Sequence, residues 1–173
     1  MTARRMVQTR PMLAHAVRTI PYLLRGVVGE RSLVSRIRRR VRISECDFNR
    51  HMNQAAYAEV AELGRSDWLV RSGLMRALWT AKTKPVVAEQ RLVYRRELAP
   101  GRRYILDTRA TGIDGRLVSI DAHFLVGDRV HAVIHAKLIT IGPHGVLDAD
   151  AVENLFTPFV APALDVVDWR VTG

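Results

Sequence analysis

The chain contains a single cysteine, Cys46, among its 173 residues. One cysteine excludes an intrachain disulfide and a zinc site built on several thiolates, and it fits a reducing compartment. No apolar run approaches the roughly 20 residues that a membrane-spanning helix needs. The apolar stretch near the N-terminus is broken by His15, Arg18, Pro21 and Arg25, which does not match the core of a secretory signal. We therefore expect a cytoplasmic protein.

Lysine is also scarce: Lys82, Lys84 and Lys137 are the only three. Arginine supplies the other 24 of the 27 positive charges, and the net charge is +10. Such an excess attracts nucleic acid, an anionic membrane surface or a small phosphorylated molecule. The sequence has no nucleic-acid recognition motif and no basic patch interleaved with aromatic residues, so we expect no nucleic-acid partner. Its length and apolar content are typical of one globular domain.

Residues 1–37 have apolar side chains near helical spacing with arginines between them. We interpret this segment as a basic amphipathic extension, and two roles for it are open. In the first it packs against the domain or against a partner copy, which we favour because Pro21 breaks a long helix lying on a membrane. In the second it makes a peripheral contact with anionic lipid.

A strand and a long helix are predicted next. The alternation over residues 39–47 indicates the strand. Apolar residues at helical spacing then follow Asn53, a favoured N-cap, and continue to the stop signal Ser72-Gly73. Gly64 lies inside this helix, where glycine costs about 1 kcal/mol against alanine.

The remainder is predicted to be mostly strand. A short helix or an irregular cover over 74–81 precedes four strands, at 85–98, 103–112, 116–126 and 129–141, and tight turns separate the last three. Short connections predict that all four pair in sequence order as a meander. The long helix is apolar or small over much of its surface, so the sheet has to cover it. The predicted fold class is therefore α+β, with a curved antiparallel sheet around a central helix and an edge strand open to dimerisation.

Polar side chains recur at every second position just before the long helix, at Asp47, Asn49, His51 and Asn53. One interpretation is a polar turn, in which Asp47 and Asn49 form Asx turns, His51 donates to a carbonyl and Asn53 caps the helix. The other is a catalytic or ligand-binding group, since this spacing allows the four side chains to converge. The residues alone leave both interpretations open.

The stretch Asp47-x-Asn49-x-His51-x-Asn53-Gln54-x-x-Tyr57 resembles the D-x-N-x-H-x-N-N-x-x-Y motif of acyl-ACP and related acyl-CoA thioesterases. Glu62-Leu-Gly-Arg65 is similar to an acidic-then-arginine pattern of the same proteins, and Glu45-Cys46-Asp47 to the hydroxybenzoyl-CoA thioesterase branch. Together with the layout, residues 38–145 resemble the hotdog-fold thioesterases, with residues 1–37 and 146–173 as extensions. The C-terminal extension is expected to hold a helix over 149–158. One departure is that Gln54 replaces the second Asn of the motif.

The resemblance implies hydrolysis of an acyl-CoA or acyl-ACP thioester to a free acid and a thiol, by a homodimer or homotetramer without a metal or redox cofactor. It implies that Asp47 is a general base or nucleophile, that His51 orients water or moves a proton, and that Asn49 helps to polarise the carbonyl. It also implies substrate contacts from Asn53, Gln54, Tyr57 and Glu62. The alternative is a non-catalytic protein of the same fold that binds acyl thioesters, either free or at a membrane.

Other reactive residues have simpler interpretations. Strand parity places Cys46 on the face opposite Asp47, where it is expected to be a small core residue. Glu62 is expected to pair with Arg65, and a second catalytic carboxylate is the alternative for it. His131 and His135 share a strand face but have no acidic or cysteine partner nearby in the sequence, so no metal site is expected. The arginines at the turn between two strands either bind coenzyme A phosphates or form a solvated edge: Arg95, Arg96, Arg102 and Arg103.

Overall fold

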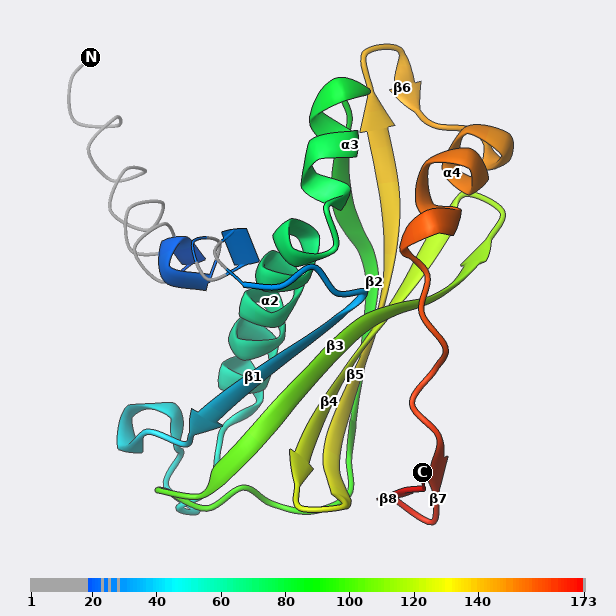
Figure 1. Ribbon diagram of the computed structural model, residues 1–173. Coiled ribbons are helices and arrows are strands. Elements are labelled where there is room, and N and C mark those ends of the chain that lie inside the picture. The colour runs from blue at the N-terminus through cyan, green and yellow to red at the C-terminus, as the bar shows by residue number, and fades with distance from the viewer. Residues whose placement is uncertain (1–18, 23, 25, 28, 173) are drawn as a thin grey trace, which may run out of the picture.

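A curved antiparallel sheet around one long helix makes up most of the molecule (Figure 1). The computed structural model describes residues 19–22, 24, 26–27 and 29–172. The long strands of this part are β1 (Val34–Arg40), β2 (Lys84–Tyr94), β3 (Arg103–Asp114), β4 (Leu117–Val126) and β5 (Arg129–Gly142). The predicted fold class, an α+β hotdog fold, is confirmed.

The central helix α2 (Gln54–Arg71) begins and ends where the sequence predicts. The Asn53 side chain accepts the Ala56 amide at 2.8 Å, which satisfies one of the free N–H groups of the first turn. At the other end Gly73 has φ +88°, a left-handed conformation that glycine adopts without strain. The chain then continues into the short helix α3 (Leu74–Thr80).

The order of strands in the sheet differs from the predicted meander. The order is β1-β3-β4-β5, and β2 pairs with β5 at the far edge instead of with β3. The connection 95–102 makes this possible because it passes the start of α2, where Leu98 is fully buried and its carbonyl accepts the Met52 amide at 2.9 Å. The meander prediction was therefore right for β3 to β5 and wrong for β2. The end of β2 now lies beside the start of α2.

The first strand lies earlier in the chain than predicted. Its inward positions are Ser35, Ile37 and Arg39. Because two of these three residues are polar, the strand lacks the alternation of apolar and polar residues by which it could be predicted. Arg39 is accommodated because it donates to Glu45, Tyr22 and Tyr104. After Arg40 the chain leaves the sheet and forms the 3-10 turn η1 (Ile43–Glu45). The predicted strand over 39–47 was therefore wrong, and the expected boundary at 37/38 falls inside β1.

The C-terminal extension covers both faces of the sheet. Helix α4 (Ala149–Phe156) packs with α3 and the end of α2, burying Trp68, Leu78, Val152 and Phe156 in one cluster. The turn η2 (Thr157–Phe159) then leads to the opposite face, where Figure 1 shows the last residues on the side of the sheet away from α2. There the short strands β7 (Val166–Val167) and β8 (Arg170–Val171) adjoin β5, whose other end pairs with β6 (Gly145–Val146).

A short helix precedes the sheet, with helical backbone at 19–22, 24 and 26–27. One side of it is packed on the domain. The Tyr22 hydroxyl accepts from Arg39 Nη1 at 2.6 Å, and a Cβ added to Gly26 would lie 2.9 Å from Val70 Cβ. Residues 1–18 of the predicted extension lie outside the described residues. None of the described helices is long and apolar enough to cross a membrane.

Candidate active site

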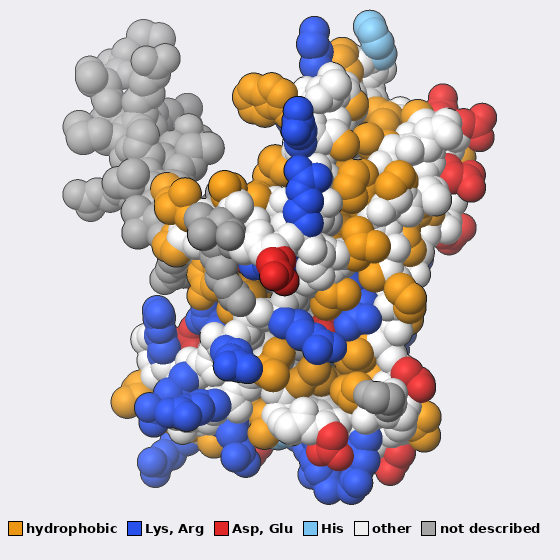
Figure 2. All heavy atoms as spheres, in the orientation of Figure 1, with side chains coloured by type: hydrophobic (Ala, Val, Ile, Leu, Met, Phe, Trp, Pro, Cys, Tyr) orange, Lys and Arg blue, Asp and Glu red, His pale blue; other side chains and the backbone are white. Residues whose placement is uncertain are grey.

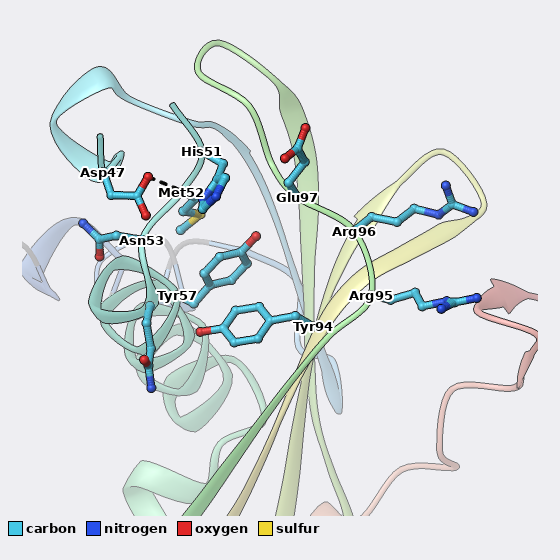
Figure 3. A pocket seen from close by; sticks show the side chains of 10 residues that line it. Asp47, His51, Met52, Asn53, Tyr57, Tyr94, Arg95, Arg96 and Glu97 are labelled. Atoms are coloured by element: carbon cyan, nitrogen blue, oxygen red, sulfur yellow. Dashed lines mark ion pairs between the residues drawn. The ribbon is translucent and has the colours of Figure 1, made fainter. Parts of the chain in front are cut away.

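A cleft of about 400 Å³ opens where the loop before α2 meets the start of that helix and the end of β2 (Figure 3). Three segments that are distant in sequence line it: the loop over 47–53, the first turn of α2 and the corner over 94–97. Its lining residues are Asp47, His51, Met52, Asn53, Gln54, Tyr57, Tyr94, Arg95, Arg96 and Glu97.

Hydrogen bonds within the loop hold the Asp47 carboxylate in place. The Asp47 amide donates to the His51 carbonyl at 3.0 Å, and Oδ1 accepts the Asn49 amide at 2.9 Å. His51 Nδ1 lies 3.6 Å from the same Oδ1, and Figure 3 shows the two side chains facing each other. Each side chain is about one-third exposed, at 33%. The second oxygen, Oδ2, has no hydrogen-bond partner among the described residues and is available to water or substrate.

Both interpretations of the alternating residues describe part of this loop. Asp47 forms an Asx turn and Asn53 caps the helix, as the polar-turn interpretation predicts. Asp47 and His51 nevertheless also line the cleft. Asn49 is exposed and is not among the lining residues; its contact with the site is its backbone N–H. The turn geometry and the ligand-accessible carboxylate therefore belong to the same structure.

The first turn of α2 adds hydrogen-bond donors to the cleft. The amides of Gln54 and Ala55 have no acceptor among the described residues, as is usual for the first turn of a helix. These N–H groups carry the positive end of the helix dipole. Gln54 lines the cleft and Ala55 follows it in the helix, so these donors are suited to bind a carbonyl oxygen on which negative charge develops.

Two tyrosines form the floor of the cleft. The rings of Tyr57 and Tyr94 meet edge to face at 5.3 Å between centroids, and Tyr57 also packs on Phe124 at 4.9 Å. Burial raises the pKa of both tyrosines, so both hydroxyls stay neutral near pH 7. The floor therefore presents an aromatic surface without charge, which suits an apolar group of a ligand.

The corner over 95–97 is held by a buried histidine. The amides of Arg95 and Arg96 both donate to the His131 carbonyl at 2.9 Å, and His131 Nδ1 lies 3.0 Å from the Glu97 carbonyl oxygen. Burial lowers the pKa of His131, so the imidazole is neutral near pH 7. In Figure 3 the Arg95 and Arg96 side chains point away from the Asp47–His51 pair. Their charges lie at the rim of the cleft.

Two other predicted residues lie elsewhere. Glu62 is on α2 outside the cleft. Burial lowers the pKa of Arg65, and the negative charge of Glu62 acts in the opposite direction by raising it. Cys46 packs partly buried against the core, and burial raises the pKa of its thiol. The parity argument for Cys46 was wrong, because neither Cys46 nor Asp47 lies in the strand.

Comparison with known proteins agrees with this architecture. A family model described as the thioesterase-like superfamily matches residues 41–150. The fold is similar to YbaW, a probable thioesterase from Escherichia coli, with 18% identity and a TM-score of 0.67, covering 73% of this chain and 98% of that one.

Two further structures show the same fold. The DHNA-CoA thioesterase from Staphylococcus aureus has 14% identity and a TM-score of 0.58, with 73% of this chain and 87% of that one covered. The 12:0-ACP thioesterase from Umbellularia californica has 12% identity and a TM-score of 0.67, with 79% and 54% covered. At these identities the structures establish the fold alone. The family match spans well over half of the chain and contains every residue that lines the cleft. The chain therefore belongs to the thioesterase-like superfamily.

Proposed function

We propose that the protein hydrolyses an acyl thioester of coenzyme A or of an acyl carrier protein to a free acid and a thiol. The observation that carries the proposal is the Asp47 carboxylate, held beside His51 at a cleft that Gln54 also lines, at the start of α2 where the first-turn amides are free. A base, a proton carrier and donors for an oxyanion are what thioester hydrolysis needs.

In the proposed reaction Asp47 Oδ2 removes a proton from water as the water oxygen bonds to the thioester carbon. The carbonyl oxygen becomes negative and accepts hydrogen bonds from the Gln54 and Ala55 amides. The carbon–sulfur bond then breaks, and the thiolate receives the proton from Asp47, directly or through His51. Asn49 acts here through its backbone N–H, which positions the carboxylate. These steps use neither a metal nor a redox cofactor.

The substrate is placed by the shape and charge of the cleft. The acyl group lies on the apolar floor formed by Met52, Tyr57 and Tyr94, and the side chains of Asn53 and Gln54 contact the thioester region. The rim arginines Arg95 and Arg96 face the phosphorylated carrier, since a cationic rim favours an anionic group. Glu62 lies outside the cleft, so no substrate contact is proposed for it.

Thiol release tests the proposal. Purified protein is mixed with a panel of short, long and aromatic acyl-CoA thioesters and with acyl-ACP, and free thiol is followed with a chromogenic reagent. We expect turnover of at least one member above the uncatalysed rate. Tight binding of a thioester without thiol release from any member would instead support the non-catalytic binding protein.

We also propose that two copies pair through β2. This strand is bonded to β5 on one side, most of its residues are exposed, and no other described strand pairs with it. Exposed strand edges are usually covered, and Val86 and Val87 are both exposed on this one. Light scattering should give twice the chain mass for the wild type and a monomer for the Val86→Lys, Val87→Lys double variant. A monomeric wild type, or a double variant that stays dimeric, contradicts this pairing.

A further inference from the structure

A second surface, remote in sequence from the cleft residues, exposes large apolar side chains. We call it the N-terminal patch and define it by five exposed residues of the first helix and α3: Ile20, Leu24, Val27, Met75 and Trp79. Trp79 is 85% exposed and Val27 is 69% exposed. In Figure 2 hydrophobic and cationic side chains gather over α3. The patch shares no residue with the lining of the cleft.

The orientation of the first helix exposes its three residues of the patch. Residues 20, 24 and 27 recur at helical spacing and therefore share one side of the helix. The opposite side is docked on the domain through Tyr22 and Gly26, so the apolar side faces outward. Between this helix and α3 lies a groove of about 410 Å³, lined by Val27, Met75 and Trp79 among others. The two helices therefore form one surface.

The charged side chains that line the groove have one sign. Arg31 and Arg76 line the groove, and the described residues that line it include no Asp or Glu. The Arg31 guanidinium lies over the α2–α3 junction, where a Cβ added to Gly73 would be 3.6 Å from Nη1. The nearest acidic residue in sequence is Glu30, and no Asp or Glu precedes it in the chain. Residues 1–29 carry five arginines, at positions 4, 5, 10, 18 and 25.

The patch has an apolar centre and a cationic border, and this combination favours an anionic membrane over a second copy of the chain as its partner. A second copy placed on this patch would bring its own arginines against Arg31 and Arg76, which like charges oppose. An anionic bilayer instead offers apolar chains to the centre and negative headgroups to the border. Tryptophan is enriched at the level of the headgroups, and arginines near an anionic membrane surface strengthen binding to it.

We propose that the N-terminal patch binds the surface of an anionic membrane. The first helix and α3 then lie along the headgroups, with Val27, Met75 and Trp79 inserted at the boundary with the acyl chains. The contact is peripheral, since no described helix can cross the bilayer. The proposal does not depend on the proposed hydrolysis, because the patch and the cleft have separate residues.

Sedimentation of the full chain with vesicles tests this proposal. We expect binding to vesicles of phosphatidylcholine mixed with phosphatidylserine, weaker binding to phosphatidylcholine alone, and loss of binding as salt is raised. Val27→Glu should reduce binding about tenfold or more, since a carboxylate in the boundary region costs free energy and meets negative headgroups. The matched control is Val167→Glu on β7, where the valine is similarly exposed at 61%; it should bind as the wild type does.

A second readout follows Trp79 itself. Brominated lipid should quench the fluorescence of the wild type, and Trp79→Phe should remove most of the quenching, because Trp68 is fully buried and Trp169 packs in a separate cluster with Leu125 and Val130. Equal binding by Val27→Glu and Val167→Glu, or no preference for phosphatidylserine, would overturn the proposal. A change of mass in light scattering for Val27→Glu alone would show that a second copy covers the patch instead. Thiol release from soluble acyl-CoA should be the same for all these variants, which separates this proposal from the proposed hydrolysis.

Discussion

Asp47→Asn is expected to lower kcat for thioester hydrolysis by about 10²- to 10⁴-fold, the range that general acid–base catalysis contributes. The amide oxygen of asparagine can still accept the Asn49 N–H, so the loop keeps its conformation. It cannot take a proton from water. KM should therefore change little, and a stopped assay of thiol release over a range of substrate concentrations separates the two constants.

The matched control for this variant is Asp114→Asn, at an exposed carboxylate of the hairpin between β3 and β4, which should keep full activity. Asn49→Ala should also have a small effect, because its contact with Asp47 is a backbone amide. Full turnover by Asp47→Asn would remove Asp47 from the proposed chemistry. A single turnover in ¹⁸O-labelled water tests the role further, since label recovered in Asp47 would indicate a nucleophile and not a base.

Local signals explain which parts of the fold could be predicted from the sequence. The bounds of α2 are set by the Asn53 cap and the left-handed Gly73, and both act within a few residues of the helix ends. Strand pairing has no such local signal. β2 lies beside β5 because the connection after it passes the helix. The alternation of inward and outward side chains along a strand is the same whichever strand it pairs with, so it does not reveal the neighbour.

The missed strand order also explains the missed site residues. Tyr94 and Glu97 reach the cleft because the end of β2 lies beside the start of α2, which the predicted meander excludes. Asp47 and His51 lie within five residues of each other, so a local motif was enough to find them. The loop residues of the cleft were therefore predicted, whereas Tyr94 and Glu97 were not, and Arg95 and Arg96 were singled out only for their charge.

Gly64 shows how packing can reverse a preference that the sequence suggests. Helix propensity alone favours alanine there by about 1 kcal/mol. In the structure, a Cβ at Gly64 would lie 2.7 Å from Leu106 Cδ2 and closer still to Thr108 Oγ1, both on β3. Glycine therefore allows α2 to approach the sheet, and crowding there opposes the gain in propensity.

The buried ion pair of Asp67 with Arg71 joins α2 to the start of the sheet. Asp67 is fully buried and accepts from Arg71 Nε at 3.0 Å and from the Ser35 hydroxyl at 2.5 Å. Arg71 also donates to the Glu30 carbonyl at 2.9 Å. These bonds hold the segment between the first helix and β1 against α2.

Asp67→Ala should lower the free energy of unfolding by about 3–5 kcal/mol, because it leaves the Arg71 charge in a mostly buried position without its carboxylate. Urea denaturation measures the change. The matched control is Asp128→Ala, since Asp128 and Arg170 lie 4.0 Å apart with side chains 62% and 52% exposed. An exposed pair contributes at most about 1 kcal/mol.

The double variant Asp67→Leu, Arg71→Met should recover most of the loss, because apolar side chains of similar size need no partner. If the two Asp→Ala variants lose equal stability, the buried pair does not hold this junction.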